Sequence, residues 1–112
     1  MELQRIAHAL DAEVICGPEE WESIQIETVF ASDLMSDVLM SDRENMLMIT
    51  SLSTEQSIRS AGIVGSEAVV IANNKTVTEG MIELANDQDI TLLRTRHPKY
   101  ESCVRLGRIM EP

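Results

Sequence analysis

Two apolar runs of strand length, each followed by a polar turn and a helix-capping signal, constrain the fold of this chain more than any other feature. The predicted strands are Met46 to Ile49 and Glu67 to Ala72. A strand that is apolar at nearly every position is typical of a parallel sheet covered by helices on both faces. The two runs therefore predict the centre of an α/β sheet.

Helical patterns follow both runs. Ser53-Thr54-Glu55-Gln56 and Thr76-Val77-Thr78-Glu79 have the form of capping boxes, in which the first hydroxyl accepts a hydrogen bond from a free backbone N–H of the first turn. The first predicted helix carries Ile58 and Ala61 and stops near Gly62. The second is expected to bury Met81, Ile82 and Ala85.

The rest of the chain continues this alternation. Apolar spacing predicts an opening helix on Leu3, Ile6, Ala7 and Leu10, and the short apolar run Val14 to Cys16 stops at the turn signal Gly17-Pro18. From residue 24 onward the expected order is strand and helix four times over, which predicts a single α/β domain, residues 1–112, with a mostly parallel sheet flanked by helices. The remaining predicted elements are a strand from Ile24 to Phe30, a helix capped by Ser32 or Asp33 with the stripe Leu34, Met35, Val38 and Leu39, a strand from Ile90 to Leu93, and a last helix with Pro98 at its first position and Tyr100, Cys103, Val104 and Gly107 facing inward.

Composition limits the possible partners. The net charge is −10, from 19 acidic and 9 basic residues, and no basic run occurs. Such a surface repels nucleic acid and anionic membranes, which are bound through clusters of Lys and Arg. With only three aromatic residues, the core must consist of Ile, Leu, Val, Met and Ala.

Cysteine usage and the amino-terminal segment predict a cytoplasmic protein. Residues 1–10 lack the layout of a secretion signal, and no apolar stretch approaches ~20 residues. Cys16 and Cys103 lie far apart without C-x-x-C spacing, so we expect buried reduced thiols rather than a disulfide or a zinc site.

Polar residues follow the expected carboxyl ends of the strands. Ligands of open α/β sheets bind there, and the free N–H groups at the starts of the following helices favour anions. A small phosphorylated or nucleotide-like ligand fits this chemistry, although the same Ser, Thr, Asn and Asp residues are also what helix caps require. The candidate ligand-binding residues are Ser32, Asp33, Thr50, Ser51, Ser53, Asn73, Asn74, Lys75, Thr76, Arg96 and His97.

No catalytic motif accompanies these residues. The sequence lacks the G-x-x-x-x-G-K-[ST] loop of nucleotide hydrolysis, and Gly62 and Gly65 precede a predicted strand, so they indicate a helix stop. His8 is expected on the surface, and His97 suits a cap as well as a ligand site. Asp33 and Asp37 could share a cation or form a solvated acidic face, and the second reading is favoured. We therefore expect no catalytic residue, no metal and no cofactor.

The order of these residues resembles the DRTGG domain family. The resemblance is carried by residues 31–39 with the strand at 46–50, by Ala68-Val-Val-Ile-Ala-Asn-Asn-Lys-Thr, by the helix from Glu79 to Ala85, and by residues 90–95. It implies an α/β domain, related to the amino-terminal domain of HPr kinase/phosphorylase, that occurs alone or attached to other modules. In those settings the domain is regulatory or assembly-forming, and the kinase chemistry belongs to a separate P-loop domain.

The chain departs from the family pattern at two places. Asn73 and Asn74 stand where the name motif has Gly-Gly, and Ser32-Asp33-Leu34 lacks the motif's arginine. Asn tolerates a left-handed backbone better than other non-glycine residues, so the turn can survive, but two side chains now occupy the space. Any anion site of other members is expected to be weakened here.

The sequence therefore predicts a non-catalytic regulatory domain that binds an adenine nucleotide or another phosphorylated metabolite. The alternative is a protein-interaction or assembly subunit of a larger enzyme complex with no small-molecule ligand. The resemblance also implies a homodimer.

Overall fold

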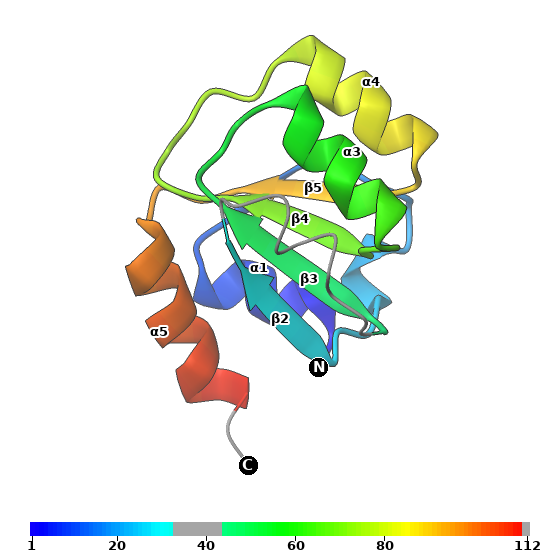
Figure 1. The fold of residues 1–112 in the computed structure, drawn as a ribbon. Coiled ribbons are helices and arrows are strands. Elements are labelled where there is room, and N and C mark those ends of the chain that lie inside the picture. The colour runs from blue at the N-terminus through cyan, green and yellow to red at the C-terminus, as the bar shows by residue number, and fades with distance from the viewer. Residues whose placement is uncertain (33–43, 111–112) are drawn as a thin grey trace.

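A five-stranded sheet with helices on both faces forms the centre of the molecule (Figure 1). The computed structural model describes residues 1–32 and 44–110. The strand order across the sheet is β1-β5-β4-β3-β2. In chain order the elements are α1 (Leu3–Ala9), β1 (Glu13–Cys16), the 3-10 helix η1 (Trp21–Ser23), β2 (Thr28–Ala31), β3 (Met46–Thr50), α3 (Glu55–Ile63), β4 (Ala68–Ile71), α4 (Glu79–Asp87), β5 (Thr91–Arg94) and α5 (Lys99–Met110).

Four strands, β2 to β5, run parallel. Leu47 of β3 lies opposite Ala68 of β4, and Val70 of β4 lies opposite Leu93 of β5. Parallel neighbours need a crossover connection, and α3 and α4 provide the crossovers from β3 to β4 and from β4 to β5. The prediction of an α/β domain with a mostly parallel sheet is confirmed.

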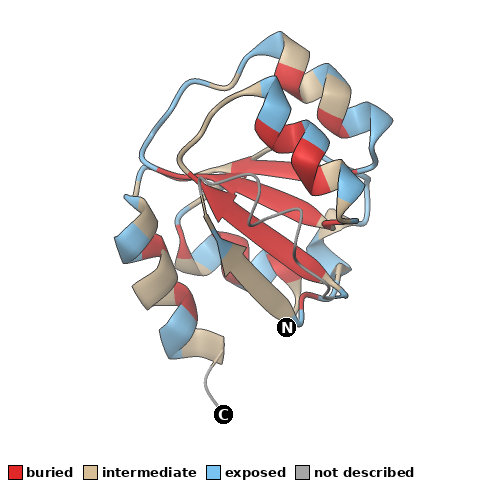
Figure 2. Cartoon of the chain, viewed as in Figure 1, coloured by how far each residue is buried: buried red, intermediate tan, exposed pale blue. Residues whose placement is uncertain are grey.

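The two central strands are buried on both faces, as Figure 2 shows. Alternate residues point to opposite faces of a strand. Ile49 and Val70 belong to the cluster that α1 and α5 cover, whereas Met48 and Ile71 belong to the cluster beneath α3 and α4. The buried hydrophobic residues are Leu, Ile, Val, Met and Ala, as the composition predicts.

The first strand was not predicted. Residues 13–16 form β1, which pairs with β5 in antiparallel orientation, with Glu13 opposite Arg94. As an edge strand β1 is only half-buried, and its apolar run, Val14 to Cys16, is shorter than those of the central strands. The predicted strand at Ile24 to Phe30 is also shorter, since β2 begins at Thr28 and the backbone N–H of Ile26 donates to the carbonyl of Met1 instead.

The inward face of α5 differs from the prediction. The side chains of Ser102 and Leu106 are buried, whereas Gly107 is exposed and Tyr100 is 81% exposed. Cys103 and Val104 are half-buried. Ser102 can be buried because its hydroxyl donates to the carbonyl of Pro98 at 3.0 Å, which satisfies the polar group. The helix begins at Lys99, so Pro98 precedes its first residue.

Two other local predictions, a helix stop near Gly62 and the exposure of His8, are confirmed. The helix that carries Ile58 ends at Ile63, and Gly65 follows with φ of 73°. His8 is exposed on α1. Within the described residues, no helix is long and apolar enough to cross a bilayer. The predicted helix at 34–39, its candidate cap Asp33 and the residue Asp37 lie outside the described residues.

Candidate functional site

The carboxyl ends of β2, β3, β4 and β5 open at one edge of the sheet because the four strands are parallel. Backbone hydrogen bonds hold the loops at this edge together. The N–H of Asn73 donates to the carbonyl of His97 at 2.7 Å, and the N–H of Asn74 donates to the carbonyl of Thr95 at 2.9 Å. We call this edge the carboxyl rim, and it consists of Ser32 and residues 51–54, 73–76 and 95–97.

A left-handed turn after β4 dominates the rim. Asn73 and Asn74 have φ of 66° and 53°, and both are exposed. Asn is among the few non-glycine residues that visit this conformation readily, because its short polar side chain can bond locally. The expectation that the turn survives without the family glycines is confirmed, and the turn presents two amide side chains to solvent.

The neighbouring residues add charge and hydroxyls. Lys75 and Thr76 are exposed, and Lys75 has no ion pair with any described residue. The hydroxyl of Ser53 donates to the carbonyl of Thr76, which fastens the loop after β3 to the loop after β4. Ser32 joins the same edge through its N–H, which donates to the carbonyl of Ile49 at 3.0 Å. The structure therefore brings Ser32, Ser53, Asn73, Asn74, Lys75 and Thr76 to one edge.

Two threonines at strand ends serve the fold instead. Thr50, a predicted ligand residue, is fully buried, and its hydroxyl accepts from the N–H of Leu52 at 3.1 Å. Thr95 is also buried, and its hydroxyl donates to the carbonyl of Leu10 at 2.6 Å. A side chain without exposed surface cannot reach a ligand in solvent, so the rim presents Ser51 in place of Thr50. Ser51 is half-buried.

The helix caps lie one and two residues beyond the predicted positions. The hydroxyl of Thr54, not Ser53, accepts from the N–H of Ser57 at 3.2 Å at the start of α3. The hydroxyl of Thr78, not Thr76, accepts from the N–H of Met81 at 3.3 Å at the start of α4. Because the caps are supplied by other residues, Ser53 and Thr76 are not needed to start these helices.

Asp11 belongs to this region although the sequence did not single it out. β1 is antiparallel to β5, so the turn before β1 reaches the carboxyl end of β5. The Oδ2 atom of Asp11 lies 3.3 Å from Nε2 of His97 and 3.7 Å from guanidinium nitrogens of Arg96 and Arg105. The hydrogen bond with His97 and the nearby guanidinium groups lower the pKa of Asp11.

His97 and Arg96 therefore differ in how well their side chains can bind a ligand. The side chain of His97 is 12% exposed and held by Asp11, whereas that of Arg96 is 71% exposed. A distance of 3.7 Å is too long for a hydrogen bond, so the donors of Arg96 remain available. Among the described residues no hydroxyl or thiol bonds to the His97 ring, and Asp11 is its side-chain partner.

The thiols and carboxylates lie apart. Cys16 and Cys103 are free and half-buried, and burial raises the pKa of both thiols. No group of three metal-ligating side chains occurs within residues 1–32 and 44–110. The remaining predicted site residue, Asp33, lies outside the described residues.

Comparisons with known proteins agree with the fold. The family model of the DRTGG domain matches residues 5–109. Among solved structures, the chain is similar to the CBS and DRTGG domains of the regulatory region of Clostridium perfringens pyrophosphatase, which was crystallised with its activator diadenosine tetraphosphate. The TM-score is 0.79 at 18% identity, and the match covers 94% of this chain and 45% of that one. No curated protein matches the sequence significantly.

Proposed function

Because the chain belongs to the DRTGG domain family, we propose that it is a non-catalytic regulatory domain that binds an adenine nucleotide or another phosphorylated metabolite at its carboxyl rim. The observation that carries the proposal is the exposed turn of Asn73, Asn74 and Lys75. It places two amide groups and a cation without a described carboxylate partner at the edge where α/β sheets bind ligands.

The chemistry of the rim suits a phosphate group. Lys binds phosphate as a compact point charge with three donors, and Arg offers a planar set of donors that matches phosphate oxygens. Lys75 and Arg96 supply one of each on loops that are hydrogen-bonded to one another. The chain as a whole has a net charge of −10, which repels anions. An anion is therefore attracted to the rim only near these two cations.

The regulatory part of the proposal draws on the similar solved structure. In that protein, a DRTGG domain lies in the regulatory region of a pyrophosphatase whose activator is a dinucleotide. This chain spans 45% of that solved chain, so we propose that it acts on an enzyme that it joins or contacts. We propose further that it forms a homodimer, which light scattering tests by showing twice the 12.5 kDa mass of one chain.

Thermal unfolding of the full chain with nucleotides tests the proposal. We expect ATP or diadenosine tetraphosphate at 100 times its Kd to add roughly 2.7 kcal/mol to the free energy of unfolding. For a domain of this size that raises Tm by about 10 °C. Adenosine without phosphate should give a much smaller shift.

Matched variants locate the site. Lys75→Ala should lower the nucleotide-induced shift, because it removes the exposed cation of the turn. Arg108→Ala is the control and should leave the shift intact. α5 begins at Lys99, close to the rim, and the exposed cation Arg108 lies about 14 Å farther along this helix, at 1.5 Å per residue. If no nucleotide raises Tm and the chain forms a stable complex with a protein partner, the assembly subunit is favoured instead. Steady hydrolysis of ATP would overturn the non-catalytic proposal.

A further inference from the structure

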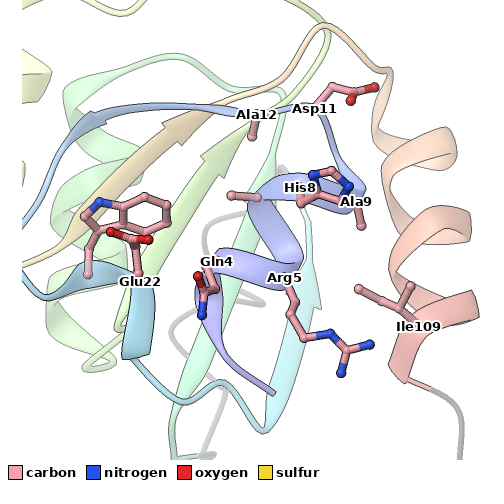
Figure 3. A pocket seen from close by; sticks show the side chains of 10 residues that line it. Gln4, Arg5, His8, Ala9, Asp11, Ala12, Glu22 and Ile109 are labelled. Carbon is pink, nitrogen blue, oxygen red and sulfur yellow. The ribbon is translucent and has the colours of Figure 1, made fainter.

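A hollow on the opposite side of the molecule from α3 and α4 is the second place where polar side chains gather. It has a volume of about 730 Å³ and lies over the outer surface of α1 (Figure 3). Pockets for small molecules in proteins measure roughly 300–1,000 Å³. η1 borders the hollow on one side with Trp21 and Glu22, and the end of α5 borders it on the other with Ile109.

The apolar part of the lining consists of Trp21, Ile109 and the small side chains of Ala7, Ala9 and Ala12. Trp21 is half-buried and packs against the core cluster beneath α1, so its indole is held in place while part of it faces the hollow. An indole face favours stacking with another aromatic ring.

Polar groups differ between the two sides of the hollow. Figure 3 shows Glu22 on one side of α1, whereas Arg5 extends from the helix away from Glu22, toward the side of Ile109. Glu22 can accept hydrogen bonds from a ring amino group, and Arg5 can bind an anion. Arg5 has no carboxylate partner among the described residues, although the chain carries 19 acidic residues.

The other acidic group of the hollow is already neutralised. Asp11 lines the hollow, but its carboxylate faces Arg96, His97 and Arg105. A negative ligand group near Arg5 therefore meets little repulsion from Asp11. The exposed ring of His8 lies on the same helix one turn after Gln4 and adds a further nitrogen to the lining.

We propose that this hollow is a second ligand site, distinct from the carboxyl rim, that takes an amino-substituted aromatic ring carrying an acidic group. The ring stacks on Trp21, its amino group donates to Glu22, and its acidic group binds Arg5. Adenosine monophosphate has this arrangement of groups and serves as the probe. The proposal does not depend on whether the rim binds a nucleotide.

The fluorescence of Trp21 tests the site directly, because it is the only tryptophan of the chain. We expect AMP to quench its emission in a saturable manner. Adenosine, which lacks the acidic group, should bind about tenfold more weakly, because it cannot form the charged hydrogen bond with Arg5. Inorganic phosphate, which lacks the ring, should leave the emission unchanged.

Three single substitutions separate this site from the alternatives. Arg5→Ala should weaken AMP about tenfold, to the affinity of adenosine. Arg108→Ala removes the same charge next to Ile109 without touching the lining, and Lys75→Ala removes the cation of the carboxyl rim, so both should leave quenching by AMP as in the wild type.

Four results would overturn the proposal. The first is the absence of saturable quenching at millimolar AMP, and the second is equal AMP affinity of the Arg5→Ala variant and the wild type. The third is an equal loss of AMP affinity in the Arg5→Ala and Arg108→Ala variants. The fourth is a change of emission with protein concentration alone, which would assign the hollow to a second copy of the chain. A nucleotide-induced rise in Tm that Lys75→Ala abolishes, without quenching of Trp21, would leave the proposed function standing and remove only this site.

Discussion

The centre of the sheet and the carboxyl rim are adjacent in the chain but opposite in character. Ala72, which directly follows β4, is fully buried, and the next residue, Asn73, is exposed. In β3 and β4 every residue is buried, whereas all four residues from Asn73 to Thr76 are exposed. Burial of apolar surface provides most of the folding free energy. The comparison indicates that the strands determine most of the stability, while each exposed side chain of the rim contributes less.

The sharpest test of this difference is the truncation of a central strand residue. Ile71→Ala leaves a cavity in the cluster beneath α3 and α4, so we expect it to lower the free energy of unfolding by about 3 kcal/mol. Urea denaturation measures the change. Ile63→Ala is the control, because this side chain is 71% exposed and its loss should cost under about 0.5 kcal/mol. Equal effects of the two substitutions would contradict the comparison.

The helix caps in the rim and directly after it, Thr54 and Thr78, should have an intermediate effect on stability. Thr54→Ala and Thr78→Ala each remove a hydroxyl that accepts from a helical N–H, so each should cost about 1 kcal/mol. Thr76→Ala removes an exposed hydroxyl that caps no helix and should cost under about 0.5 kcal/mol. A larger loss for Thr76 than for Thr78 would move the cap back to the position that the sequence pattern predicts.

The left-handed turn offers a comparison at a single position. Asn73→Ala should cost about 1 kcal/mol, because a residue with a Cβ and no local hydrogen bond is strained at φ of 66°. Asn73→Gly should leave stability nearly unchanged, since glycine adopts positive φ without strain. Thermal unfolding of the two variants checks this, and equal Tm values would show that the turn relaxes to another conformation.

The smallest effect is expected at Asp11 and depends on pH. The folded state lowers the pKa of Asp11, chiefly through the hydrogen bond with His97, so the charged carboxylate stabilises the fold above its unfolded pKa. This contribution is lost as pH falls below about 4 and the carboxylate is protonated. Asp11→Asn should therefore lower the urea midpoint at neutral pH and not at acid pH, while Asn still tolerates φ of 49° at this position. A difference between the two proteins that is constant with pH would contradict this account.

The parts of the fold that sequence patterns predict are those governed by local burial. Continuous apolar runs located β3 and β4, because strands buried on both faces admit few polar residues. β1 was missed because it is short, half-buried and identified only by its pairing with β5. Ser102 was missed on the inward face of α5 because a serine becomes suitable for the core only when its hydroxyl bonds to the preceding turn.

The candidate site shows the same limit. The rule that ligands bind at the carboxyl ends of parallel strands selected Asn73 and Lys75, which the structure does expose at the rim. It also selected Thr50, because the residue type gives no sign of burial. Asp11 contacts His97 from 86 residues away, and nothing local marks that contact. At both caps two hydroxyl residues lie within three positions, so the choice between them depends on backbone conformation.

The central claim is that the carboxyl rim binds a phosphorylated ligand and that no bond is broken there. The most direct measurement is a titration of the full chain with ATP. Two-dimensional ¹H–¹⁵N NMR spectra monitor the backbone amides, and ³¹P spectra of the same samples monitor the ATP. The account predicts saturable shifts of the amide signals of residues 73–76, 96 and 97, little change for β3 and β4, and ATP that stays intact. Amide signals at the rim that do not move at saturating ATP, or ³¹P signals of ADP and phosphate that grow with time, would contradict it.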